Sequence, residues 1–266
     1  MCVFRYFAPA LRLLLITILV VLCAAFLMHP WKSHAGATGR GAVVIELFTS
    51  EGCSSCPPAD NLLTHLRQDM AGKGIEVIPL GFHVDYWNSL GWKDRFSSAE
   101  FSQRQEQYAR TLGVDGPYTP QMVVNGKKEF VGSNAGRAQR AITEAAGEPA
   151  AVEVGISLNP GNQLGVQVKG SASANGAAVI LAVTEDNLTT QVGAGENNGH
   201  ELRHTAVVRR LKQIGTVQEG SFKTDFALKV EKDWKPGDLR AVVFVQQSGP
   251  GRVLGAASVP LPAQAR

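Results

Sequence analysis

Residues Glu46 to Pro57 read Glu-Leu-Phe-Thr-Ser-Glu-Gly-Cys-Ser-Ser-Cys-Pro, and the rest of the chain is interpreted outward from this stretch. An apolar run, 43–48, ends in a small polar loop that carries Cys53 and Cys56, and a helical pattern follows. Two thiols at this spacing can close a small disulfide. A helix N-terminus stabilises a thiolate, which is the form that attacks a disulfide. The motif therefore predicts a redox-active cysteine pair.

The composition excludes several classes of protein. The chain has 266 residues, enough for one or two domains, and its hydrophobic content of 44% is enough for ordinary cores. The net charge of +3 is too small to indicate a nucleic acid or an anionic membrane surface as partner.

The first 35 residues have the pattern of a targeting segment. Arg5 and Arg12 form a positive start, 13–28 is an uncharged apolar run, and 33–35 offers small residues for a signal peptidase. The run is long for a signal core and short for a spanning helix, so a cleaved signal peptide is favoured and an uncleaved anchor is the alternative. Both export the rest of the chain, because the positive end stays inside. The protein is expected in the periplasm or outside the cell, with membrane contact only through this segment if it is uncleaved.

The cysteine count changes when this segment is set aside. Of four cysteines, Cys2 and Cys23 lie in it, which leaves Cys53 and Cys56. One pair that closes so short a loop constrains little of the unfolded chain and does not make a disulfide-stapled scaffold. Two cysteines alone also make a poor zinc site. We therefore expect no bound metal.

The pattern along 41–147 predicts alternating strands and helices. The predicted elements are a strand at 41–48, a helix at 59–70, a strand at 75–82, a helix at 97–112, strands at 121–124 and 128–131, and a helix at 134–146. Asn125-Gly126 is a strong signal for a hairpin turn between the last two strands.

This order resembles the thioredoxin fold over 41–147. Two motifs carry the resemblance: the Cys53–Cys56 pair after a strand, and Thr119-Pro120 before the hairpin, where thioredoxin-like proteins place a cis-proline beside the cysteines. The resemblance implies that Cys53 forms a mixed disulfide with a partner and that Cys56 resolves it. It also implies that Thr119 and Pro120 shape the surface where the partner's chain docks.

Glu46 is a candidate supporting residue. It lies in a largely apolar strand, and thioredoxin carries a buried carboxylate one residue closer to its cysteines. By that resemblance Glu46 would exchange protons with Cys56. The alternative is a Glu46 satisfied by a lysine or a backbone group, since a shift of one residue reverses the face of a strand side chain.

A longer set of phrases resembles a narrower family. The stretches 46–60, 83–87, 91–94 and 118–121 are similar to a family of exported bacterial proteins of unknown function. Members of that family join a thioredoxin-like half to a β-rich half. The resemblance implies fold and compartment, and it lends no substrate.

The composition changes after the linker at 147–149, and the second half reads as β-rich. The predicted strands are 151–158, 163–170, 177–184, 205–214, 221–230, 239–246 and 252–259. Strands at this spacing suggest an all-β sandwich-like domain at 151–262, after an α/β thioredoxin-like domain at 41–147 and a signal peptide or anchor at 1–35. The β-rich half carries no nucleophile motif, so binding, spacing or shielding is its expected role.

The start of the helix bears on which cysteine reacts. If the helix starts near Cys53, Pro58 should bend it; if Cys56 is the cap, Pro57 is a natural first residue and the helix dipole holds Cys53 less strongly. We expect Cys53 to be the exposed, acidic thiol and Cys56 the sheltered one.

Two segments are placed to cover the site. About twenty residues more than in a minimal thioredoxin lie between the second strand and Pro120, and they include an aromatic-rich loop. The polar stretch 185–198 either leans over Cys53 or is simply mobile.

Three histidines have neighbours that allow a second kind of site. His83 and Asp85 are two apart after a strand, and His200 and His204 flank Glu201 at a strand spacing. Either group would suit a metal or a proton shuttle, but a hydrogen-bonded loop and an exposed strand edge are the favoured interpretations.

The favoured function is an exported thiol–disulfide oxidoreductase that acts on protein or small-molecule thiols and disulfides of the cell envelope and needs no dissolved cofactor. One alternative is a periplasmic Cu(I)-binding chaperone with His83 as third ligand, since two thiolates suit this soft ion. The other is a non-catalytic interaction module of the cell envelope whose disulfide never turns over.

Overall fold

The structure is a computed structural model that describes residues 41–262, so the expected targeting segment at 1–35 lies outside the described residues. The elements of 41–147 are β1 (Val43–Thr49), α2 (Pro57–Ala71), β2 (Val77–His83), α3 (Ala99–Leu112), β3 (Gln121–Val124), β4 (Lys128–Val131) and α4 (Ala135–Gly147). They confirm the predicted order, each within a few residues of its expected bounds. Within 41–262, no helix is long and apolar enough to cross a bilayer.

The second half is strand-rich, as expected. Its strands are β5 (Val152–Asn159), β6 (Gln163–Gly170), β7 (Ala178–Glu185), β8 (Leu188–Gln191), β9 (Glu201–His204), β10 (Val207–Thr216), β11 (Ser221–Ala227), β12 (Leu239–Gln246) and β13 (Val253–Pro260). Seven of them match the predicted strands. The short strand β8 was not predicted, because it lies in the polar stretch 185–198, and β9 was not among the seven predicted strands, although the sequence favoured a strand edge at His200 and His204.

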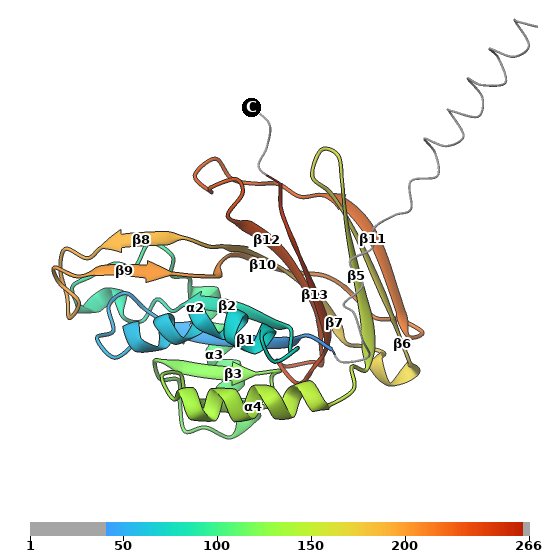
Figure 1. Ribbon diagram of the computed structural model, residues 1–266, viewed down its shortest axis with the longest axis horizontal. Helices are drawn as coiled ribbons and strands as arrows, with labels where there is room; N and C mark the ends of the chain where they lie inside the picture. The colour runs from blue at the N-terminus through green and yellow to red at the C-terminus, as the bar shows by residue number, and fades with distance from the viewer. Residues whose placement is uncertain (1–40, 263–266) are drawn as a thin grey trace, which may run out of the picture. The chain divides into compact units, whose positions relative to one another are not determined.

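One large mixed sheet joins the two halves of the chain. Its strand order is β13-β12-β7-β10-β2-β1-β3-β4, with β1 parallel to β2 and antiparallel to β3 (Figure 1). The link between the halves is the pairing of Val207 with Gly81. The boundary expected between 41–147 and 151–262 is therefore not a boundary of this sheet. Sequence patterns mark which residues form strands, but they do not say which strands pair.

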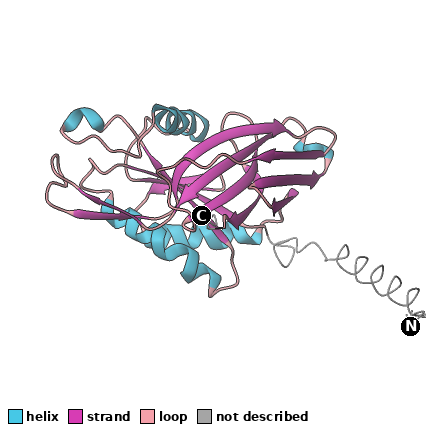
Figure 2. Cartoon of the chain, turned by 90° about the horizontal axis from the view of Figure 1, so that it is seen from above, coloured by secondary structure: helices cyan, strands magenta, loops and turns pink. Residues whose placement is uncertain are grey.

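The helices lie on both faces of the first part of the sheet (Figure 2). Alternate residues of β1 divide between two cores: Val43, Ile45 and Leu47 pack with α2 and α4, whereas Val44 and Phe48 pack with α3 and with β12. This division follows from the two-residue period of a strand. Because α2 packs on one face of β1 and follows it directly in the chain, the N-terminus of α2 lies beside the carboxyl end of β1.

A second sheet, β11-β6-β5, packs face to face with β7, β12 and β13. The core between them is built from alternate residues of both sheets, such as Val154 and Val166 on one side and Leu181 and Val243 on the other. The described part of the chain is therefore a mixed α/β structure that is rich in strands, with one large sheet and few helices.

Candidate functional site

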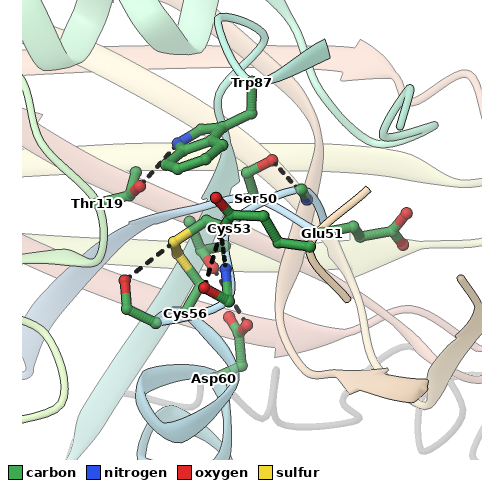
Figure 3. The surroundings of a disulfide bond; sticks show 12 residues. Ser50, Glu51, Cys53, Cys56, Asp60, Trp87 and Thr119 are labelled. Atoms are coloured by element: carbon green, nitrogen blue, oxygen red, sulfur yellow. Dashed lines mark hydrogen bonds between the residues drawn. A yellow bond between two sulfur atoms is a disulfide. The ribbon is translucent and has the colours of Figure 1, made fainter. Parts of the chain in front are cut away.

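Cys53 and Cys56 are joined by a disulfide in the loop between β1 and α2, with Cα atoms 5.4 Å apart (Figure 3). The helix begins at Pro57, and Cys56 occupies the cap position without a side-chain cap bond. Of the two helix starts allowed by the sequence, the structure has the one in which the proline is the first helical residue, where its missing N–H costs nothing. Cys53 therefore lies outside the helix, where the dipole acts on it less strongly.

Both cysteines are fully buried, at 0% exposure. The expectation that Cys53 is exposed is wrong for this disulfide form, although Ser54 and Ser55 between the cysteines are exposed. The Ser55 hydroxyl lies 3.2 Å from the Cys53 sulfur and is the nearest polar group that could donate to a thiolate there.

The cover over Cys53 comes from the second half of the chain. Residues 192–200, called the strap here, connect β8 to β9 and cross residues 50–56, the loop that carries the disulfide and is called the redox loop here after the role proposed for it below. The buried Asn197 amide donates to the carbonyls of Glu51 (2.9 Å) and Cys53 (3.0 Å). Glu196 accepts from the backbone N–H and the hydroxyl of Ser54 (3.0 and 2.7 Å). Of the two expectations for the polar stretch 185–198, the structure therefore has the one in which it leans over Cys53.

The aromatic-rich loop that follows β2 covers a second side. The Trp87 indole donates to the Thr119 hydroxyl (2.9 Å) (Figure 3), and Trp87 lies so close to Gly52 that a Cβ added at Gly52 would meet the Trp87 Cβ at 3.2 Å. The Thr119–Pro120 peptide is cis, as the resemblance implied. The structure thus brings Thr119 and Trp87 to the redox loop.

A buried cluster of histidines and carboxylates lies behind the loop. His83 Nδ1 is 2.6 Å from Asp94 Oδ2, and the same carboxylate accepts the backbone N–H groups of Glu51 and Phe96 (2.9 Å each). The His83 and His204 rings are 4.8 Å apart between centroids. The cluster draws on the redox loop, the end of β2, the insertion and β9.

One corner of this cluster is incompletely satisfied. His204 Nε2 lies 3.3 Å from Glu51 Oε1, within ion-pair range but outside hydrogen-bond geometry, and neither atom has a hydrogen-bond partner among residues 41–262. The other Glu51 oxygen accepts from the Trp92 indole (2.8 Å). Burial opposes the charged form of Glu51, but the nearby His204 ring and the Trp92 indole outweigh it and lower the pKa of this carboxyl.

The histidine groupings expected from the sequence differ in the folded chain. Asp85 accepts from the Ser102 hydroxyl of α3 instead of joining His83. His200, the last residue of the strap, is exposed, whereas His204, the last residue of β9, is buried. No group of three metal-ligating side chains is found among residues 41–262.

Burial of the His83–Asp94 pair makes folding stability depend on pH. Burial disfavours the His83 cation, but the charge and hydrogen bond of Asp94 outweigh it and raise the pKa of His83 above 6.5. The pair's contribution is therefore complete below pH 6.5 and is lost as the pH rises through the folded pKa. His83→Gln is expected to melt below the parent protein at about pH 6, by about 2–4 °C for each kcal/mol lost, with a smaller gap at about pH 9.

Calorimetry across this range checks the prediction. His200→Gln is the matched control, because its side chain is exposed, and it should leave the profile unchanged. A constant gap between His83→Gln and the parent protein would contradict the ionic origin of the effect.

Asp60 is a site residue that sequence reasoning missed. It lies one turn into α2, its backbone N–H donates to the Cys56 carbonyl (3.1 Å), and its buried carboxylate accepts from the Thr49 hydroxyl (3.1 Å). Burial raises the pKa of Asp60 above its usual value. A signal was present: Asp60 stands three residues before Leu63, on the apolar face of the helix.

Glu46 is not the carboxylate beside the cysteines. It shares a face of β1 with Val44 and Phe48, opposite to α2, and binds Arg104 of α3 through both oxygens (2.6 and 2.9 Å). The hydrogen-bonded alternative for Glu46 is therefore the correct one, with an arginine in place of the expected lysine. The reason is the register of the strand: a carboxylate one position further from the cysteines faces the other side.

Comparisons with known proteins place the chain among relatives of unknown function. A family model described as "Protein of unknown function (DUF1223)" matches residues 44–246. A crystal structure of a protein from Agrobacterium tumefaciens is 31% identical with a TM-score of 0.66 and covers 86% of this chain and 98% of its own. HBP35 of Porphyromonas gingivalis is 18% identical with a TM-score of 0.59, covers 86% of this chain and 79% of its own, and is alike in fold alone. No curated protein sequence matches.

Proposed function

The chain belongs to the DUF1223 family of proteins of unknown function, and we propose that it is an exported thiol–disulfide oxidoreductase with Cys53 and Cys56 as its redox pair. The observation that carries the proposal is the disulfide in a loop that ends at the N-terminus of α2, with a buried carboxylate, Asp60, in the first turn of that helix. We place the reaction in the cell envelope, with protein or small-molecule thiols and disulfides as partners.

The element order of 41–147 supports a thioredoxin-like half. The Cys53–Cys56 loop follows β1, which is flanked by β2 and β3, and Thr119 is tied to the redox loop through Trp87. We assign the β-rich half the role of shielding the pair, since the strap supplies the cover over Cys53.

The proposed exchange has two steps. In the reduced protein the Cys53 thiolate attacks one sulfur of a partner disulfide, which forms a mixed disulfide and releases the other partner sulfur as a thiolate. The Cys56 thiolate then attacks the Cys53 sulfur, which releases the second partner thiolate and leaves Cys53–Cys56 oxidised. The reverse sequence oxidises a partner dithiol, and reduction potentials decide the direction.

We assign Asp60 the proton transfer that this sequence needs. A buried thiol must lose its proton before it can attack, and Asp60 lies one helical turn after Cys56, with its carboxylate turned toward the redox loop (Figure 3). Because burial raises the pKa of Asp60, it accepts a proton more readily than an exposed carboxylate does.

The burial of both sulfurs favours a second candidate, a structural disulfide that never turns over. The experiment that separates the two is equilibration of the full-length protein with glutathione buffers, followed by an insulin-reduction assay. The proposal expects the pair to equilibrate and insulin reduction to be catalysed. A disulfide that resists mild reductant in the native protein, with no catalysis, would overturn the proposal and establish the structural role.

A related measurement, the rate at which dithiothreitol reduces the disulfide, tests the strap. Asn197→Ala removes two hydrogen bonds to the redox loop, each worth about 1 kcal/mol, so reduction by dithiothreitol should be up to about thirtyfold faster. Asn198→Ala is the control, because Asn198 is exposed and its side chain makes no hydrogen bond in residues 41–262. Equal rates for both variants and the parent protein would show that the strap does not limit access.

A further inference from the structure

A cleft of about 410 Å³ lies away from the redox loop, where β12 and β13 approach the start of β2 and the end of α2. It is called the Arg240 cleft here. Its apolar walls include Ala71, Ile75 and Val242, and its polar groups are Arg67, Glu76, Arg240 and Ser258. Its volume is in the range of small-ligand sites, and such sites favour places where two parts of a fold meet.

Arg240 is the main cationic group of the cleft. One of its Nη atoms donates to the Ser258 hydroxyl (2.9 Å), and within residues 41–262 no carboxylate lies within ion-pair distance of it. Arg67 is paired with Asp186 (3.2 Å). Burial and the nearby charge of Arg67 lower the pKa of Arg240. The carboxylates of Asp186 and Glu76 act in the opposite direction on this pKa, but neither pairs with Arg240. An anion in the cleft would therefore give the Arg240 guanidinium the direct ionic partner that it lacks within residues 41–262.

The cleft also opens onto an unpaired strand edge. Val43 pairs with Val77 and donates to the Glu76 carbonyl, so even-numbered residues of β2 bond to β1. Gly81 donates to the Ala206 carbonyl on the other side, and Val207–Gly81 is the register pair between β2 and β10. By the alternation of a strand, the N–H and C=O of Val77 and the C=O of Pro79 face away from β1.

Val77 and Pro79 line the cleft, although most of the surface of each residue is buried. In the described part of the chain, no strand pairs with Val77 or Pro79 on that side. Pro79 suits such a position, because it has no N–H to leave unpaired. The cleft thus offers a backbone donor, two backbone acceptors, a guanidinium and an apolar wall within one concave surface.

We propose that the Arg240 cleft binds the carboxy-terminal residues of an extended peptide. The terminal carboxylate pairs with Arg240, the peptide backbone adds along the open edge of β2 at Val77 and Pro79, and an apolar side chain packs against Ile75 and Val242. Strand addition supplies main-chain hydrogen bonds, and capture of the carboxylate sets the direction of the peptide. This site is independent of the redox chemistry.

The test is a titration of isotope-labelled full-length protein with N-acetyl-Ala-Ala-Leu, followed by amide NMR at Val77. The free acid should shift the Val77 amide in a saturable way and bind about tenfold or more tightly than its carboxy-terminal amide, because a charge-assisted hydrogen bond is lost in the amide. Equal binding of acid and amide, or no saturable shift at millimolar peptide, would overturn the proposal.

Three variants sharpen the assignment. Arg240→Gln should weaken the free acid by about tenfold or more, and Glu76→Gln should strengthen it because it removes a like charge. If Arg240→Gln does not fold, Ser258→Ala frees the guanidinium from its tether and should weaken binding while circular dichroism stays native. Inorganic phosphate that shifts the same amides with equal affinity would show a simple anion site and overturn the peptide assignment.

Discussion

Cys56→Ser is expected to lose catalysed insulin reduction completely and to accumulate mixed disulfides on Cys53. Exchange needs a second thiolate to release the partner, and in this variant the second sulfur is missing. Cys53 is the expected point of attack because the Ser55 hydroxyl, 3.2 Å from its sulfur, can donate to a thiolate there. Mass spectrometry of protein purified under acid quench measures the adducts.

Cys53→Ser is the matched variant for this experiment. It should lose the same activity and carry no mixed disulfide, since the proposed exchange assigns Cys56 the resolving step and not the attack on the partner. Adducts on Cys56 of Cys53→Ser, with none on Cys53 of Cys56→Ser, would reverse the two roles. That outcome would also agree with a helix that begins at Pro57 and whose dipole stabilises a thiolate at Cys56 more than at Cys53. The absence of adducts in both variants would contradict redox exchange altogether.

Glu46→Leu is expected to lower the free energy of unfolding by about 3–5 kcal/mol, the usual cost of removing one partner of a buried ion pair. Arg104 is almost fully buried, and its guanidinium also donates to Gln246 of β12 (2.9 Å), so the substitution leaves a charge in the core. Tyr108 donates to the same carboxylate (2.5 Å) and loses that acceptor. The network joins β1, α3 and β12, so the loss should affect both halves of the molecule.

Urea unfolding of two further variants isolates the ionic part. Arg104→Met alone should also destabilise the protein, because it leaves Glu46 buried without its cation. The double variant Glu46→Leu/Arg104→Met should be destabilised by much less than the sum of the single variants, since well-packed apolar residues replace a buried pair at little cost. Strict additivity would mean that the two side chains do not depend on each other. Glutathione exchange should be unchanged in folded Glu46→Leu, because Glu46 faces away from α2.

Local patterns were sufficient for much of this protein. The apolar run of β1, the loop with Cys53 and Cys56, the Asn125-Gly126 turn and the alternation of the later strands depend on residues close together in the chain. For that reason the element order and the cysteine pair could be predicted. The strands β8 and β9 were missed because they are short and polar, so their pairing depends on contacts across the strap more than on their own propensity.

The tertiary structure alone decided what surrounds the cysteines. The face of Glu46, the burial of Asp60 and the His83–Asp94 pair all depend on strand register and on how segments pack. Asn197 reaches the redox loop from 144 residues away, and Val207 pairs with Gly81 across the two halves. Such contacts leave no periodic trace in the sequence, because each is made by one side chain or one backbone pair whose position is fixed by the packing of the whole chain.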